Sequence, residues 1–293
     1  MSLSGPYSQK NKQTCSVEKK PVIGIIGGSG LCELPRLKIS ESIEIETPYG
    51  KPSGPISIGE LFGECVAFLP RHGKEHIIPP HKVPYKANLS ALKSLGMRHV
   101  IGTCVVGSLR KEIEPGTFVI PDQFINFTWE RDDTYEIDHQ PVHLPMARPY
   151  CEHIRSIIIR EIMAMGICCQ TTGTVVVIQG PRFSTIAESK MFALWGGDIV
   201  NMTQYPECYF ARELGLCYGA IATVTDYDVG VPDTISMELK FRETVLAIFH
   251  RNTTKTTSLL GRLAGSAQEI ISCDCATDRL AEYYKLASGD NSP

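Results

Sequence analysis

The sequence lacks the features of several common classes of protein. None of its 293 residues belongs to an apolar run near the roughly 18 residues that span a bilayer, and the first twenty lack the apolar centre of a signal peptide. Neither sign of charge dominates, because 29 basic residues stand against 32 acidic ones. A slightly acidic chain is a poor general binder of nucleic acid. We therefore expect an intracellular, cytoplasmic protein with neither a membrane nor a nucleic-acid partner.

The eleven cysteines show no zinc-ribbon spacing, and their odd number in a long chain is not typical of a secreted disulfide framework. We expect most of them to be buried, reduced thiols that act as small hydrophobic residues. Cys273 and Cys275 are different, because they lie in polar sequence and are too close together for an ordinary metal clip. A redox pair and two independent thiols both remain open, and no metal site is predicted.

The pattern of apolar residues predicts one α/β domain with a mixed central β-sheet flanked by helices, because strand-like and helix-like segments alternate without a linker. We expect a mobile polar tail at 1–20, the domain at 21–265, and a partly ordered C-terminal segment with Cys-x-Cys at 266–293. The predicted strands are 22–26, 56–58, 65–69, 99–106, 117–124, 174–178, 198–202 and 216–225. The predicted helices are 87–97, 149–166, 185–195, 206–214 and a long last helix from about residue 236.

A glycine-rich turn, Gly-Gly-Ser-Gly (27–30), follows the first predicted strand. Small residues let backbone N–H groups approach an anion, and Ser29 adds a hydroxyl donor. The dinucleotide-binding fingerprint is incomplete, because Glu33 stands where its third glycine belongs, and the Gly-Lys-Ser/Thr of a P-loop is absent. A plain tight turn and a phosphate site both fit this motif.

Arg71 and His72 follow another predicted strand, where ligands often bind in α/β proteins. The planar guanidinium of arginine suits a phosphate or a carboxylate. The same stretch, His72-x-x-Glu75-His76, also fits the H-x-x-E-H pattern of some zinc peptidases. That chemistry needs both histidines on one helix face, and Pro79-Pro80 would end such a helix after about two turns. A zinc peptidase is therefore a remote alternative.

Two carboxylates and one aromatic ring form a possible purine site. Asp226 and Asp228 follow a predicted strand, and residues two apart on an extended chain point the same way. One protonated and one ionised carboxyl group would match the ring nitrogen and the amino group of adenine. Phe183 lies in a Gly-Pro-containing break between a strand and a helix, where its ring could stack on a flat ligand. Solvated aspartates and a core phenylalanine are the alternative interpretations.

Taken in order, these motifs carry a family resemblance over roughly residues 21–265. The series comprises Gly-Ile-Ile-Gly-Gly-Ser-Gly-Leu (24–31), Pro-Arg-His-Gly (70–73), Pro-Pro-His-Lys-Val (79–83), Gly-Ser-Leu-Arg (107–110), Pro-Asp-Gln-Phe-Ile (121–125), Gly-Pro-Arg-Phe-Ser (180–184), Asn-Met-Thr (201–203), Pro-Glu (206–207) and Thr-Asp-Tyr-Asp (225–228). It resembles the methylthioadenosine phosphorylase branch of the trimeric purine nucleoside phosphorylase family.

The resemblance implies a phosphorylase/hydrolase-like fold, a homotrimer or a dimer of trimers, and no metal or organic cofactor. It implies phosphorolysis of 5′-methylthioadenosine, with inorganic phosphate as co-substrate, to adenine and 5-methylthioribose 1-phosphate. The phosphate-site residues that it implies are Ser29, Arg71, His72 and Thr203, with Cys104 and Val105 beside the phosphate and ribose. The nucleoside-site residues that it implies are Met202 at the ribose, Phe183 and Ser184 at the base, Asp226 and Asp228 at the base edge, and His143 and Met237 near the 5′ substituent. By the resemblance, His143 reaches the site across a subunit interface.

Some positions depart from the family pattern. Cys104 replaces the usual Thr or Ser, Val105 replaces the usual Ala, and Gln179 replaces a Glu that could organise the sugar hydroxyls. A phosphorylase for 6-oxopurines, such as methylthioinosine, inosine or guanosine, is the alternative within the family. Such enzymes generally carry Asn at the first base-reading position, so Asp226 and Asp228 favour a 6-aminopurine. A nucleoside-binding protein without turnover is a further alternative.

Overall fold

The computed structural model describes residues 21–135, 143–231 and 242–276 of the chain. The expected polar tail at 1–20, Met237 and the expected start of the last helix near residue 236 lie outside these residues. The described part contains no helix that is long and apolar enough to cross a membrane.

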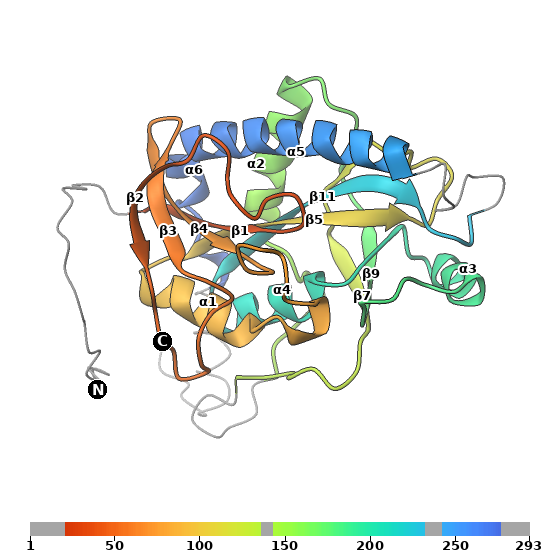
Figure 1. The fold of residues 1–293 in the computed structure, drawn as a ribbon, viewed down its shortest axis with the longest axis horizontal. Helices are drawn as coiled ribbons and strands as arrows, with labels where there is room; N and C mark the ends of the chain where they lie inside the picture. The colour runs from red at the N-terminus through yellow and green to blue at the C-terminus, as the bar shows by residue number, and fades with distance from the viewer. Residues whose placement is uncertain (1–20, 136–142, 232–241, 277–293) are drawn as a thin grey trace, which may run out of the picture.

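The centre of the fold is a mixed sheet of eleven strands, which confirms the predicted fold class (Figure 1). The strands are β1 (Ile23–Gly27), β2 (Lys38–Ile43), β3 (Ile56–Leu61), β4 (Glu64–Pro70), β5 (His99–Ser108), β6 (Phe118–Val119), β7 (Gln123–Phe127), β8 (Cys169–Gln170), β9 (Thr174–Ile178), β10 (Ile199–Asn201) and β11 (Cys217–Tyr227). The main path runs β2-β3-β4-β1-β5-β10-β9-β7. Strand β5 is a branch point, because it pairs with β11 along its whole length as well as with β1 and β10.

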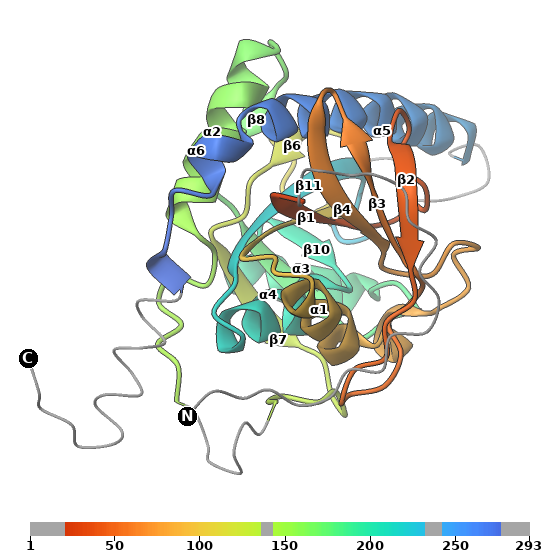
Figure 2. The ribbon, with the colours of Figure 1, turned by 90° about the vertical axis from the view of Figure 1, so that its left-hand side faces the viewer.

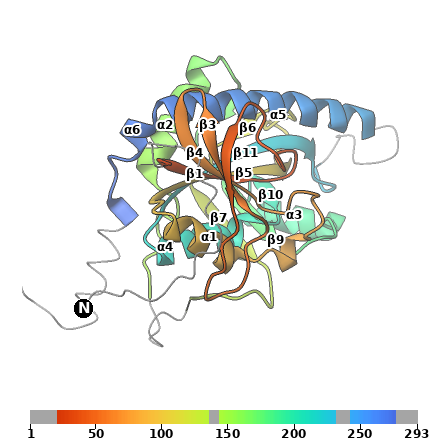
Figure 3. The same cartoon turned by 60° about the vertical axis from the view of Figure 1, so that its left-hand side comes forward.

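Helices cover the sheet from two sides. Helices α2 (Glu152–Ala164), α5 (Arg242–Gly265) and α6 (Ala267–Ile270) lie on one side, and α1 (Tyr85–Ser94) and α4 (Gln204–Glu213) lie on the other (Figures 1, 2 and 3). A short 3₁₀ turn (Pro80–Lys82) precedes α1, and α3 (Ile186–Leu194) lies at the far end of the molecule. Because both faces are covered, β1 is buried and apolar throughout and most of β5 is buried, as expected of central parallel strands.

The structure differs from the expected elements in a divided strand, a missed strand and a shifted helix start. The expected strand at 117–124 is two strands, β6 and β7, because Pro121 between them supplies no N–H to a ladder. The sequence pattern missed β2, which is a largely exposed edge strand without an apolar face. The expected N-terminal start of the second helix at Pro149 is also early, since α2 begins at Glu152 with Cys151 as its cap. Helix α3 begins with a capping box, in which Thr185 and Glu188 satisfy each other's backbone N–H groups.

Candidate active site

A cavity of about 550 Å³ opens where β1, β4, β5 and β11 end, a size usual for small-ligand sites. These four strands are mutually parallel where they pair, so their carboxyl ends meet at one edge. Strand β10 runs antiparallel to β5 and brings the following residues back beside it. The predicted site residues that line the cavity are Ser29, Arg71, His72, Cys104, Val105, Phe183, Ser184, Met202, Thr203, Asp226 and Asp228.

Arg71 forms the floor of one end of the cavity and is fully buried. Its Nε and Nη2 each donate to the Glu207 carboxylate at 2.6 Å, and its Nη1 donates to the Thr103 carbonyl at 2.7 Å. Burial by itself would lower the pKa of Arg71, and the Glu207 carboxylate more than offsets this. Tyr218 Oη also donates to Glu207 at 2.6 Å. The guanidinium is therefore held rigidly as a cation, with two of its five N–H groups left for a ligand.

Local sequence assigns Glu207 no role beyond its place in the Pro-Glu pair at 206–207. The residue lies 136 positions from Arg71 in the chain. Only the fold shows that a carboxylate in helix α4 compensates the charge of a residue at the end of β4.

His72 lies beside Arg71 as a neutral ring. Burial and the Arg71 cation lower the pKa of His72 to about 4. Its Nδ1 lies 2.8 Å from the Ile78 carbonyl, which can only accept, so Nδ1 carries the proton and Nε2 is left as an acceptor. Toward a phosphate, His72 can therefore accept from a P–OH group but not donate.

His76 is a lining residue that the sequence analysis considered only as a zinc ligand. Its ring lies 4.6 Å from that of His72, and its Nε2 lies 3.4 Å from the Ser29 hydroxyl. Residues 71–76 form successive turns rather than a helix, and His76 has a positive φ of 55°. The zinc-peptidase alternative is therefore wrong, because it needs both histidines on one face of a helix. Among the described residues, no metal-ligand group involves these histidines.

Cys104 and Thr203 lie at the same end as Arg71. Burial raises the pKa of Cys104 to about 11, so the residue is a neutral thiol at physiological pH. It accepts a hydrogen bond of 3.6 Å from Gln204 Nε2. The thiol is a weaker donor than the hydroxyl expected from the family pattern. Thr203 precedes α4, and its side chain does not cap the helix, so its hydroxyl can serve a ligand.

Asp226 and Asp228 line the cavity at the carboxyl end of β11, where a β-bulge between Val224 and Asp226 breaks the regular alternation. Burial raises the pKa of Asp226 to about 6, and a 2.6 Å hydrogen bond from the Thr225 hydroxyl only partly opposes this. Burial also raises the pKa of Asp228. The Oδ2 atom of Asp228 is buried and has no hydrogen-bond partner among the described residues. The cavity thus offers one carboxyl group that titrates close to neutral pH and one buried acceptor.

Apolar side chains complete the walls. Phe183 is 61% exposed, so it is not a core residue, and it lies at the cavity with Ser184 and Met202. Leu246 and Phe249 of helix α5 also line the cavity, although no sequence motif marks them as site residues. The wall is suited to a flat base and an apolar substituent.

Two expected residues lie elsewhere. His143 is exposed and does not line the cavity of its own chain. Gln179, expected near the sugar, lies outside this cavity lining and instead accepts from Arg131 Nε at 3.1 Å and from the Trp129 amide at 3.3 Å. Arg131 also donates to the Gln179 carbonyl at 2.8 Å, so these contacts order the chain that leads to Phe183.

Three comparisons with known proteins agree with one another. The family model of the phosphorylase superfamily matches residues 22–264. An S-methyl-5′-thioadenosine phosphorylase from Thermococcus kodakarensis is 47% identical, over 87% of this chain and 96% of its own length. One from Mycolicibacterium smegmatis is 49% identical, over 72% of this chain and 78% of its own. The structure of methylthioadenosine phosphorylase from Schistosoma mansoni in complex with adenine has a TM-score of 0.80 and 34% identity, covering 90% of this chain and 99% of that one.

Proposed function

The chain belongs to the phosphorylase superfamily, and we propose that it cleaves the N-glycosidic bond of 5′-methylthioadenosine with inorganic phosphate. The products are adenine and 5-methylthioribose 1-phosphate, which makes the protein a pentosyltransferase. The proposal is supported by relatives of that name at 42–49% identity. A related Schistosoma mansoni structure holds methylthioadenosine, at 33% identity and a TM-score of 0.81. The observation that carries the substrate assignment is the pair of carboxyl groups in the cavity, half-buried Asp226 and buried Asp228.

The end of the cavity around Arg71 is the proposed phosphate site. The two N–H groups that Glu207 and Thr103 leave available, with the hydroxyls of Ser29 and Thr203, supply donors for phosphate oxygens. His72 accepts from the phosphate hydroxyl, and Cys104 and Val105 lie against the phosphate and ribose. Holding both substrates in one cavity removes much of the entropic barrier of a bimolecular reaction.

The end around Asp226 is the proposed base site. Asp226 protonates N7 of the purine, so that the base leaves as a neutral molecule, and a pKa of about 6 suits a general acid near neutral pH. Asp228 accepts from the 6-amino group. Phe183 and Ser184 flank the base, and Met202 contacts the ribose. Positive charge grows on the sugar as the bond breaks, as in glycoside hydrolysis, and the clamped phosphate stabilises that charge before it attacks C1′.

A 6-oxopurine substrate is disfavoured by Asp228. The buried Oδ2 atom would face the O6 acceptor of such a base, and an unpaired buried acceptor costs about 1–3 kcal/mol. No comparable penalty arises with a 6-amino group, which donates.

We also propose an oligomeric state and roles for residues outside the cavity. We infer a homotrimer or dimer of trimers in which His143, exposed and outside its own cavity, serves the 5′ substituent in a neighbouring subunit. We assign Met237 to the same substituent from the family resemblance alone. The catalytic domain spans 21–265, the reaction uses no metal or organic cofactor, and the protein is cytoplasmic.

The proposal is tested by measuring adenine release from methylthioadenosine with and without phosphate, alongside adenosine, inosine and methylthioinosine. We expect rapid release from methylthioadenosine only with phosphate, and kcat/KM for methylthioinosine lower by about tenfold or more, the equivalent of the unpaired acceptor. Base release without phosphate would mean a hydrolase, and a preference for inosine-type bases would overturn the roles of Asp226 and Asp228.

A further inference from the structure

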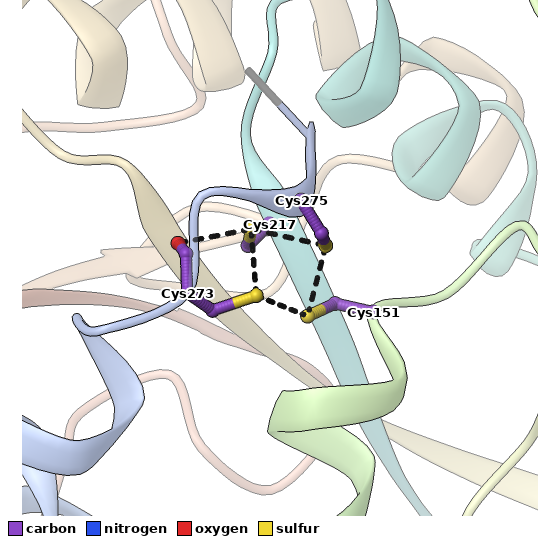
Figure 4. Close-up of side chains that lie close together, drawn as sticks. All are labelled: Cys151, Cys217, Cys273 and Cys275. Atoms are coloured by element: carbon purple, nitrogen blue, oxygen red, sulfur yellow. Dashed lines mark hydrogen bonds between the residues drawn. The ribbon is translucent and has the colours of Figure 1, made fainter. Parts of the chain in front are cut away.

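Four cysteines gather at the end of β11 that is remote from the cavity. Cys217 begins β11, Cys151 caps helix α2, and Cys273 and Cys275 lie in the segment after α6 (Figure 4). Their four sulfur atoms all lie within 4.8 Å of one another. Asp226 lies nine positions after Cys217 on β11, which corresponds to about 30 Å of extended strand between this cluster and the base site. The cluster is therefore independent of the proposed reaction.

Four of the six Sγ–Sγ distances in this four-cysteine cluster match those of a tetrahedral zinc site, and all six are within 4.8 Å. The Sγ atom of Cys151 lies 3.8 Å from Cys273 and 3.6 Å from Cys275, and that of Cys217 lies 4.0 Å and 3.7 Å from the same two atoms. Four sulfurs at about 2.3 Å from a central Zn²⁺ in a tetrahedron lie about 3.8 Å apart. No pair lies near the roughly 2.05 Å of a disulfide bond.

The helix terminus beside Cys151 and the burial of two of the four cysteines suit a metal site. The Ile154 amide, in the first turn of α2, donates to Cys151 Sγ at 3.5 Å, and the positive end of that helix dipole stabilises an anion at its cap. Cys151 and Cys217 are buried, which agrees with the closed character of structural metal sites. Binding of a divalent cation displaces the thiol protons of its cysteine ligands.

The Cys-x-Cys segment is also held in place by other contacts. Arg98 forms an ion pair with Asp274, and His99 Nε2 donates to the Cys273 carbonyl at 2.7 Å. The Arg98 cation lies close to a site that would carry a net negative charge. Such outer contacts orient the ligands of metal sites.

We propose that Cys151, Cys217, Cys273 and Cys275 bind one Zn²⁺ in a structural Cys₄ site that fastens the C-terminal segment to β11 and α2. On binding, four S–H bonds break, four Zn–S bonds form, and four protons pass to solvent, so no oxidant or reductant is needed. The spacing of Cys273 and Cys275 does not by itself indicate this site, because Cys-x-Cys is shorter than the usual spacing of a pair of metal ligands. The other two ligands come from residues 151 and 217, which only the fold brings near.

The test uses the full chain purified with a thiol reductant and without chelator. We expect about one zinc per chain by elemental analysis, and X-ray absorption that shows four sulfur neighbours at about 2.3 Å. The Cys275→Ser variant should lose most of the zinc and melt at a lower temperature, yet retain kcat/KM, because the cluster lies far from the cavity. Cys275→His keeps a zinc-binding side chain and should regain part of the metal. Cys168→Ser, which changes an exposed cysteine, is the matched control and should keep the full content.

Three results would overturn the proposal. Two would come from the wild-type chain: four free thiols without bound metal, or a mass lowered by disulfide formation without bound metal. The third is equal zinc content in Cys275→Ser and Cys168→Ser, which would place the metal elsewhere. Because none of these measurements depends on nucleoside cleavage, failure of the zinc site and failure of the proposed reaction are distinguishable.

Discussion

Replacement of Asp226 by asparagine is expected to lower kcat/KM for methylthioadenosine by about 10²–10⁴-fold, the usual contribution of a general acid. Asparagine keeps the shape of the side chain and cannot protonate N7. Its amide can donate to O6 of a 6-oxopurine, so the ratio of kcat/KM for methylthioinosine to that for methylthioadenosine should rise. Steady-state kinetics with both nucleosides measure the two effects, and each substrate serves as the control for the other. An unchanged ratio would contradict the role given to Asp226.

The same variant should be more stable than the wild type at neutral pH. The pKa of Asp226 is about 6 in the folded protein against 3.8 as the ordinary value, so the favourable contribution of this group is present below pH 3.8 and is lost as pH rises through 6. Two pKa units correspond to at most about 3 kcal/mol. Urea unfolding should therefore show Asp226→Asn stabilised at pH 7 and indistinguishable from wild type near pH 4. A less stable variant at pH 7 would mean that the loss of activity reflects damage to the fold.

Replacement of Glu207 by glutamine is expected to lower the free energy of unfolding by about 3–5 kcal/mol, as is typical when one partner of a buried ion pair is removed. The side chains of Arg71 and Glu207 are 0% and 1% exposed, so the arginine would be left buried without its counter-charge. The amide also turns an N–H group toward one of the guanidinium donors. Phosphate affinity should fall as well, because the guanidinium would lose its fixed orientation.

The matched control is Glu60→Gln. Its partner Lys38 is 80% exposed and Glu60 is 51% exposed, and such surface pairs contribute less than about 1 kcal/mol. Urea unfolding of both variants at one pH isolates the effect of burial. Similar losses for Glu207→Gln and Glu60→Gln would contradict the structural role of the buried pair.

Local sequence patterns were sufficient to predict much of the fold and of the cavity. The apolar run at 22–26 followed by glycines, and the runs at 99–106 and 216–225, give β1, β5 and β11 because uninterrupted apolar runs are typical of strands covered on both faces. The residues at the ends of those strands, such as Ser29 and Asp226, then fall at one edge of a parallel sheet. The family resemblance added roles that no local pattern could assign.

What sequence reasoning missed depends on contacts between distant segments. Glu207 compensates Arg71 across 136 positions. Cys151 and Cys275 lie 124 positions apart and yet 3.6 Å from each other. The tautomer of His72 depends on the Ile78 carbonyl, a backbone group without a sequence signature. Strand β2 is missed for a different reason, since an exposed edge strand needs no apolar alternation.

The most direct test of the central claim is ³¹P NMR of purified protein with methylthioadenosine and inorganic phosphate, followed beside adenine release. The proposed reaction predicts that the phosphate signal is replaced by that of a sugar 1-phosphate, one for each adenine released, and that omission of phosphate abolishes both changes. Adenine release with the phosphate signal unchanged would contradict the account, because the nucleophile would then be water and the clamp around Arg71 would have another purpose.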